Sequence, residues 1–186
     1  VTGAAGFIGS HLVDLLLEEG HAVRAFVRYT SRPSLGLLDP VADRLEIVRG
    51  DLRDPGALRD AVRGCDTVLH LAALIAIPQS YRTPIEYVQA NAIGTLNLLE
   101  ACRDLGVRRV VVTSTSEVYG KSARVPFKED DVMVFGPSSK RRWAYACSKA
   151  IDEFLAIAYW KEKRLPVVIA RLFNTVGPRQ TGRYGM

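Results

Sequence analysis

The stretch that decides the fold is VTGAAGFIGSHL at residues 1–12, in which Gly3, Gly6 and Gly9 have the spacing GxxGxxG. Apolar residues at helical spacing follow and end before Gly20, so an amphipathic helix is expected. Glycine permits positive φ and lets backbone N–H groups approach a phosphate, while the start of the helix adds partial positive charge. The stretch predicts a turn that binds a pyrophosphate; the alternative is a tight strand-to-helix turn required by packing.

Short strand-like runs alternate with longer helical patterns along the chain. The runs are AVRAFVR (22–28), LEIVRG (45–50), DTVLHLAA (66–73), RRVVVTSTS (108–116) and PVVIARLFN (166–174). Val, Leu and Ile on both faces are typical of a parallel sheet that helices cover on each side. The fold class is therefore predicted to be α/β, with a doubly wound parallel sheet.

The helices are placed by their periodicity and by their start and stop signals. One precedes Gly20, one begins at Asp54-Pro55, one runs over about 84–104, and one over about 144–163. The charged stretch 121–143 has no sustained period, so we expect a long surface loop over a site.

The position of the glycine turn is unusual, because a complete strand normally precedes such a turn and anchors the centre of the sheet. Here Val1 is all that remains of that strand, and GPRQTGRYGM at 177–186 stops inside a loop. We therefore expect that a few residues are missing before Val1.

Composition narrows the class of protein. The 186 residues are 48% hydrophobic, carry a net charge of +5 and include three cysteines. No run is apolar enough for a membrane span, and the scattered Lys and Arg do not predict a nucleic-acid partner. The widely spaced cysteines predict neither a disulfide framework nor a zinc site. A cytoplasmic protein with an anionic small ligand is the expectation.

Cofactor selectivity is expected at the end of the run 22–28, where an acid would bind the ribose 2′-hydroxyl of NAD. That end offers Val27, Arg28 and Arg32 and no acid, which slightly favours NADP over NAD. Either arginine could equally be an ordinary surface charge. Asp51 and Leu52, after the next run, are placed to meet the adenine, or to cap the following helix.

Tyr145 and Lys149 form the pattern YxxxK on the helix expected at 144–163. An ammonium one helical turn from a phenol favours the phenolate and lowers the pKa of the phenol from about 10. The pair is common by chance, but behind a glycine turn it predicts a catalytic base.

At this point the chain resembles the extended short-chain dehydrogenase/reductase family, in particular its NAD-dependent nucleotide-sugar epimerases and dehydratases. The resemblance spans essentially all residues and rests on TGAAGFIGSHL, DLRD, HLAA, NAIGTLNLLEA, VVTSTSEVYG, YACSK and RLFNTVGPRQ. It implies a Rossmann-type NAD(P)-binding domain at 1–171, and at 172–186 the start of a substrate-binding region that is mostly absent from this chain.

The resemblance also implies residue roles. Thr115 would hydrogen-bond the sugar C4 hydroxyl, Tyr145 would be the C4 base, Lys149 would bind the nicotinamide ribose, and Glu117 would assist after oxidation. The implied cofactor residues are Gly3, Gly6, Phe7, Ile8, Gly9, Arg28, Asp51, Leu52, Leu71, Ala72 and Ala73, together with Tyr145 and Lys149; His70 stands beside them. The implied substrate residues are Ser116, Asn174 and Arg179. For Asn91 and Asn174, the alternative is hydrogen bonding within a loop or cap.

The family reactions share oxidation at C4 and differ afterwards. Epimerisation at C4 needs only Thr115, Tyr145 and Lys149, so a sugar-nucleotide 4-epimerase ranks first. Thr-Ser-Glu at 115–117 resembles UDP-glucuronate decarboxylases, whereas dehydratases often carry adjacent Asp-Glu there. Other classes remain open: a reductase of hydrophobic carbonyls, which the polar RLFNTVGPRQ disfavours, a non-catalytic NADP sensor, or an inactive fragment.

Many members of the family form homodimers through two long helices of each subunit. The helices expected at 84–104 and 144–163 are candidates here, because both carry apolar residues on more than one face.

Overall fold

A parallel sheet organises the chain in the computed structural model, which describes residues 1–31 and 33–180. Its strands are β1 (Arg24–Arg28), β2 (Glu46–Gly50), β3 (Thr67–His70), β4 (Arg109–Thr115) and β5 (Val167–Leu172). β1 pairs in parallel with β2, and β4 pairs in parallel with both β3 and β5. Each strand lies within a run that the hydrophobic pattern predicted.

Thr2 joins the two parts of the sheet. It forms parallel bridges to Phe26 in β1 and to His70 in β3, so it occupies the place of a central strand. The resulting order is β2, β1, Thr2, β3, β4, β5, and the glycine turn starts from the middle of the sheet. This arrangement confirms the doubly wound class.

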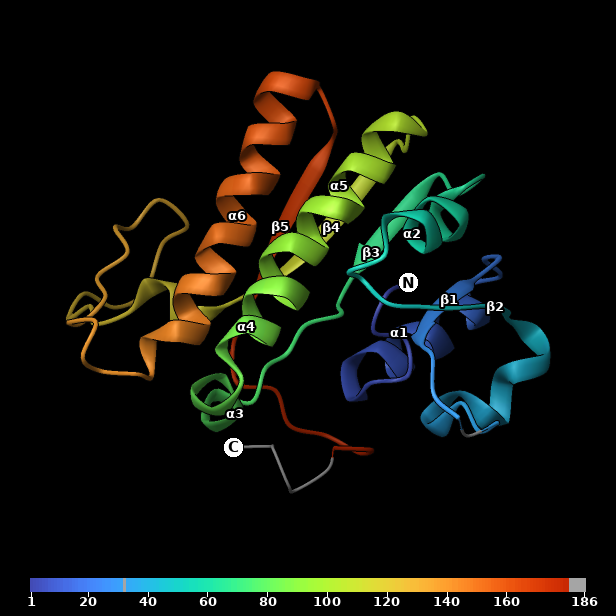
Figure 1. Ribbon diagram of the computed structural model, residues 1–186, viewed down its shortest axis with the longest axis horizontal. Helices are drawn as coiled ribbons and strands as arrows, with labels where there is room; N and C mark the ends of the chain where they lie inside the picture. Colours follow the sequence, from blue (N-terminus) through green and yellow to red (C-terminus); the bar gives the residue numbers. More distant parts are fainter. Residues whose placement is uncertain (32, 181–186) are drawn as a thin grey trace.

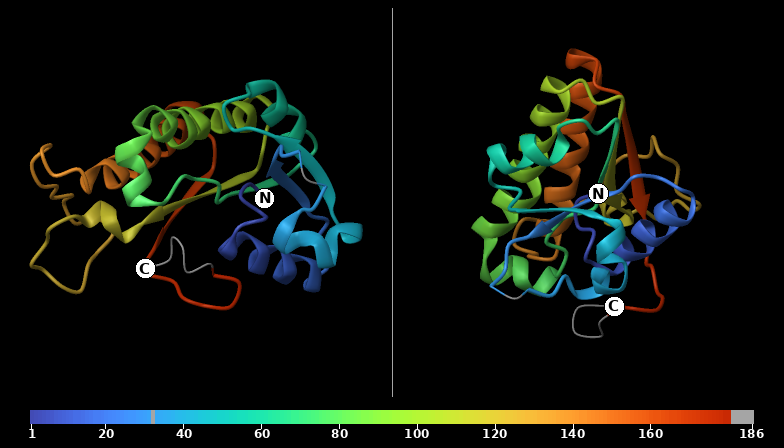
Figure 2. Two further views of the ribbon diagram at one scale, coloured as in Figure 1. Left: turned by 60° about the horizontal axis from the view of Figure 1, so that its bottom comes forward. Right: turned by 90° about the vertical axis from the view of Figure 1, so that its right-hand side faces the viewer.

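Helices lie on both sides of the sheet. They are α1 (Phe7–Glu18), η1 (Gly36–Arg44), α2 (Pro55–Val62), α3 (Ile77–Arg82), α4 (Pro84–Tyr87), η2 (Val88–Ile93), α5 (Gly94–Asp104), η3 (Ser116–Tyr119) and α6 (Trp143–Lys163). α2, α5 and α6 cover one side, whereas α1 and η1 lie on the other (Figures 1 and 2).

Local signals explain where the helices begin and end. The Asp54 carboxylate accepts hydrogen bonds from the N–H groups of Gly56 and Ala57, and Pro55 occupies the first turn of α2. Asp54 is thus the cap of this helix, which leaves Asp51 free of that role. Glycines with positive φ follow α1 and α5, at Gly20 and Gly106.

The core is divided in the same way as the helices. One cluster packs β3, β4 and Phe26 against α2, α5 and α6, and includes Leu98, Leu99 and Val110. A second cluster packs β1 against α1 and η1, with Val13 and Leu38 fully buried. Cys102 lies in the first cluster, and Cys65, Cys102 and Cys147 form no disulfide.

Four elements differ from the sequence prediction. The helix expected at 84–104 is continuous, but its middle, η2, is a π-helical turn. The helices η1, α3 and η3 were not predicted, because segments of 9, 6 and 4 residues show too little helical periodicity to detect. The loop at 121–142, which the structure describes throughout, holds neither a helix nor a strand and contributes one bridge, from Gly120 to Val134. None of the described helices is both long and apolar enough to cross a membrane.

Candidate active site

The glycine turn lies against the end of β3. Gly3 has φ of 68°, and a Cβ there would stand 2.7 Å from the backbone nitrogen of Ala72. A Cβ on Gly9 would collide with the carbonyl oxygen of Gly3. Gly6 is the N-cap of α1 and provides no side-chain cap, so the first N–H groups of the helix remain available to an anion. Gly3 and Gly9 are therefore required by close backbone approach.

A cavity of about 1060 Å³ opens over this turn and the ends of the strands. Its walls come from the turn, the ends of β1, β2, β3 and β4, α6, and residues 172–176. The predicted cofactor residues all line it: Gly3, Gly6, Phe7, Ile8, Gly9, Arg28, Asp51, Leu52, Leu71, Ala72, Ala73, Tyr145 and Lys149. The structure thus gathers segments more than a hundred residues apart around one space.

The cavity suits a dinucleotide. The bare backbone at the glycine turn leaves room for a pyrophosphate above the start of α1. Across the cavity, Ser114 is buried, and its Oγ makes no hydrogen bond with a described residue. A buried hydroxyl in this position offers a hydrogen bond to a polar ligand.

Arg28 and Asp51 face each other at the end of the cavity that β1 and β2 form. The Nε of Arg28 lies 3.9 Å from Oδ2 of Asp51, and the Arg53 guanidinium binds the same carboxylate at 2.7 Å. The Arg53 hydrogen bond is the main reason that the pKa of Asp51 falls to about 2. Asp51 is therefore an anion beside Arg28. Arg32 lies outside the described residues.

Tyr145 projects from the first turn of α6 toward the end of β4. Burial raises the pKa of its phenol to about 12, and a hydrogen bond from Thr115 opposes that shift. The sequence prediction that Lys149 lowers this pKa is wrong for the arrangement seen, because Lys149 turns to another partner. Its Nζ lies 2.6 Å from Oδ2 of Asp152, and both side chains are buried.

Glu117 lines the same cavity from η3, two residues after Thr115. Its carboxylate lies 3.3 Å from Nη2 of Arg142, which precedes α6. Asn174 also lines the cavity, from the segment after β5. Thr115, Glu117, Tyr145 and Lys149 thus form one group, consistent with their common prediction.

Three predicted residues lie elsewhere. Ser116 is next to Thr115 but does not line the cavity. Arg179 pairs with Asp14 of α1 at 2.7 Å, outside the lining. His70 is buried beneath it and bonds Thr2 and Thr95. The last six residues of the expected substrate region, 181–186, lie outside the described residues.

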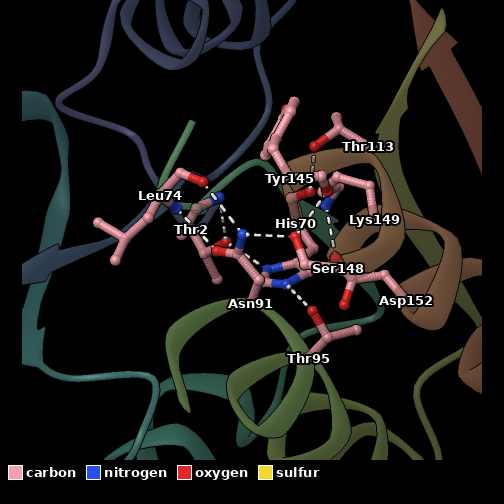
Figure 3. A network of polar contacts seen from close by, with 11 residues as sticks. Thr2, His70, Leu74, Asn91, Thr95, Thr113, Tyr145, Ser148, Lys149 and Asp152 are labelled. Carbon is pink, nitrogen blue, oxygen red and sulfur yellow. Dashed lines mark hydrogen bonds and ion pairs between the residues drawn. The ribbon is translucent and has the colours of Figure 1, made fainter. Parts of the chain in front are cut away.

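Sequence reasoning did not find every residue that shapes the site. Ser114 sits in the quoted motif VVTSTSEVYG, so strand alternation could have singled it out. Asn91 is fully buried in the π turn, where it bonds both backbone groups of Leu74 and the hydroxyl of Ser148 (Figure 3). Its role is structural hydrogen bonding, the alternative kept open for it. Asp152 gave no signal, because Lys and Asp three residues apart are typical of helix surfaces.

Comparison with known proteins supports one family. The sequence model described as GDP-mannose 4,6 dehydratase matches residues 1–185. A UDP-N-acetyl-alpha-D-glucosaminuronate decarboxylase from Bacillus cytotoxicus is 38% identical over 179 residues, which are 96% of this chain and 54% of that protein. A UDP-glucose 4-epimerase from Erwinia amylovora is 35% identical, over 100% of this chain and 55% of that protein.

Solved structures agree. A dTDP-glucose 4,6-dehydratase double mutant from Streptomyces venezuelae, with NAD bound, superposes with a TM-score of 0.83 at 35% identity, covering 96% of this chain and 56% of that one. The chain spans about half the length of the curated relatives it matches.

Proposed function

Because the chain belongs to the nucleotide-sugar epimerase and dehydratase branch of the extended short-chain dehydrogenase/reductase family, we propose that it oxidises C4 of a nucleotide-linked sugar with NAD or NADP. The observation that carries the proposal is that Thr115, Tyr145 and Lys149 line the cavity that also contains the glycine turn. A cofactor bound over the turn would accept the hydride from C4.

The residues of the chain supply the rest of this step. The Tyr145 phenolate takes the proton of the C4 hydroxyl as the C4–H bond breaks, which leaves a C4 ketone. Thr115 hydrogen-bonds to the phenol and holds the same sugar oxygen. Lys149 supplies positive charge and binds the cofactor ribose. Asn174 contacts the sugar nucleotide; Ser116 and Arg179, if they bind substrate, must first change their positions.

The reaction after oxidation is first proposed to be 4-epimerisation. It needs rotation of the keto sugar and return of the hydride to the other face. Thr115, Tyr145 and Lys149 suffice for both proton transfers. The 4-epimerase relative is consistent with this reaction.

Decarboxylation is the second candidate, and the position of Glu117 favours it. A sugar with a C6 carboxylate becomes a β-keto acid after C4 oxidation, so the C5–C6 bond breaks with loss of carbon dioxide. C5 must then receive a proton, and Glu117 lies in the cavity as an acid that epimerisation does not use. The Bacillus relative is named for such a reaction.

The deciding experiment is mass spectrometry of the full-length protein incubated with NAD or NADP and a panel of UDP-, GDP- and dTDP-sugars. A new isomer of unchanged mass identifies an epimerase, loss of carbon dioxide a decarboxylase, and loss of water a dehydratase. Tyr145→Phe should abolish the change, whereas Tyr29→Phe, on an exposed tyrosine outside the cavity, should not. Turnover by Tyr145→Phe at the parent rate contradicts the proposal.

Glu117→Gln separates the two leading candidates. A decarboxylase should lose most of its activity, because the acid for C5 is gone. An epimerase should stay within about tenfold of the parent, since its proton transfers use Tyr145.

We also propose that the protein forms a homodimer through α4, η2, α5 and α6. The support is that these elements lie side by side (Figure 1) and that α4, η2 and α6 expose a set of large apolar side chains. They are Ile85, Val88, Ile93, Ile151, Phe154, Ile157 and Trp160.

A further inference from the structure

Lys149 and Asp152 form an ion pair shut away from solvent. Their side chains are 3% and 0% exposed, and Nζ stands 2.6 Å from Oδ2 (Figure 3). Exposed pairs contribute little to stability, whereas loss of one partner of a buried pair leaves an uncompensated charge in a poorly solvated place. The charge state of Lys149 therefore depends on Asp152.

A chain of polar contacts leads from the glycine turn to this pair. The N–H of Ala72 donates to Oγ1 of Thr2 at 3.1 Å, and Oγ1 of Thr2 lies 2.7 Å from Nδ1 of His70. On the other side of the ring, Nε2 lies 3.0 Å from Oγ1 of Thr95. Figure 3 shows these groups between the start of the chain and α6.

The protonation state of His70 determines which groups donate and which accept along this chain of contacts. Burial, and then the charge of Lys149, lower its pKa to about 3, so the ring is neutral near pH 7 and carries a single N–H. The Asp152 carboxylate can only accept hydrogen bonds, so in its contact with Thr95 the Thr95 hydroxyl is the donor. Thr95 then accepts from the N–H at Nε2 of His70, and the Thr2 hydroxyl donates to Nδ1.

The Asp152 carboxylate interacts weakly with the Thr95 hydroxyl and strongly with the Lys149 ammonium. Burial raises the pKa of its carboxyl, while Lys149 and the Thr95 hydroxyl both oppose the rise. Oδ1 makes no hydrogen bond of normal geometry with the described residues, so the ammonium on Oδ2 is the dominant partner.

We propose that Asp152 is a positioning residue, which keeps Lys149 protonated and fixes its ammonium at the cavity wall, one helical turn from Tyr145. Thr95, His70 and Thr2 tie the carboxylate to the glycine turn, so that the base and the cofactor turn keep their relative positions. The positioning of Lys149 by Asp152 does not depend on the proposed function. The catalytic use of the Lys149 ammonium does rest on it.

Other ionisable groups face this pair and must be considered in any pH titration. The pKa of His70 responds to the charge of Lys149, that of Tyr145 to the charges of Asp152 and Glu117, and that of Asp152 to the charge of Glu153 on the same helix. Glu153 is itself held by Arg171 at 2.8 Å, on the side of β5. Removal of Asp152 leaves these groups in place.

The direct test is an NMR titration of the full-length protein labelled with [ε-13C]lysine, in which Lys149→Arg identifies the Lys149 signal. The midpoint of Lys149 in the parent is the reference for the variants. In Asp152→Asn its midpoint should fall by at least about one unit, because burial then acts without a counter-charge. Glu162→Gln, on the exposed end of α6, should change nothing.

A fall of less than about half a unit in Asp152→Asn overturns the inference, whatever the activity of the protein. If Asp152→Asn does not give a cooperative unfolding transition, Asp152→Glu takes its place. It keeps the charge but moves it by one methylene group, so the Lys149 midpoint must still differ measurably from the parent.

The pH profile of catalysis tests the purpose of the pair. On the sugar found by mass spectrometry, Asp152→Asn should lose activity on the alkaline side, where the parent is still active, and Asp152→Glu should restore part of it. A loss that is uniform across pH means a structural role and overturns the inference. A shifted Lys149 midpoint in a protein that converts no sugar contradicts the proposed function alone.

Discussion

Tyr145 starts as a weak base, because burial holds its pKa at about 12. A positively charged nicotinamide ring at the cavity wall should favour the phenolate and lower that pKa. Ultraviolet difference titration of the parent against Tyr145→Phe should therefore show no Tyr145 phenolate below about pH 10 without cofactor, and a phenolate signal at lower pH with saturating NAD. His70, with its pKa near 3, should add no inflection near neutral pH. An unchanged tyrosine signal on adding NAD contradicts a base that the cofactor activates.

We propose that Arg28 is the residue through which the protein discriminates between NADP and NAD. Its guanidinium lines the cavity and is largely exposed, but Asp51 competes for it at 3.9 Å. Arg28→Ala should weaken NADP binding by about tenfold, because a charge-assisted hydrogen bond to the 2′-phosphate is lost, and should change NAD binding little. Calorimetric titration with both cofactors measures this difference, with Arg49→Ala on exposed β2 as the control. Equal losses of affinity for NAD and NADP would show that Arg28 does not bind the 2′-phosphate.

At the scale of the elements, the π turn η2 holds the cavity wall to α6. Asn91 in this turn bonds the N–H and C=O of Leu74 and the hydroxyl of Ser148, and Ser148 in turn bonds the carbonyl of Tyr145. The extra residue of a π turn redirects one side chain of a helix. Here it directs the Asn91 side chain between Leu74 and Ser148.

Asn91→Ala should therefore reduce the free energy of unfolding by about 1–3 kcal/mol, since it leaves buried backbone groups of Leu74 without partners. Asn97→Ala, three residues into α5, removes a single bond to the carbonyl of Leu52 and should cost less. Urea unfolding of the two variants gives the comparison. If Asn97→Ala proves the more damaging, the π turn is not the clamp described.

The elements also show how far the sequence could predict the structure. Hydrophobic periodicity and the start and stop signals placed all five strands, the end of α1, the start of α2 and both ends of α6, because each signal is local. They did not find η2, because the helix continues through it and only its hydrogen bonding differs. α3, η1 and η3 are too short to show a helical period.

The candidate site also has features that local sequence predicts and features that depend on packing. The glycine turn and the pair Tyr145 and Lys149 are visible as motifs, so the cavity was predictable from a few local patterns. The direction of the Lys149 side chain was not, because it depends on Asp152 being buried, and burial depends on how α6 packs on β4 and α5. The position of the Arg179 side chain likewise could not be predicted, because it depends on an ion pair with Asp14, which is 165 residues away in the sequence.

At the scale of the whole molecule, the exposed apolar surface is uneven. α6 exposes Phe154 by 64%, although its other face fills the core, and η2 exposes Val88 by 55%. Large apolar side chains that gather on neighbouring helices are common at interfaces between copies. Two copies that pack these helices together would cover them, and a stable interface of this kind buries roughly 1,600 Å².

The variant Phe154→Glu should therefore convert a dimer to a monomer, because it places a charge in the centre of the interface without entering the core of the subunit. Val132→Glu is the matched control, since Val132 is 76% exposed and lies in the loop at 121–142 rather than on these helices. Light scattering after size-exclusion chromatography measures the mass of each variant. A monomeric parent, or a dimer that survives Phe154→Glu and also Val88→Glu, would place the interface elsewhere. Because Tyr145 and Lys149 lie on the same helix as Phe154, a monomer that keeps full activity would further show that the sheet alone fixes the catalytic end of α6.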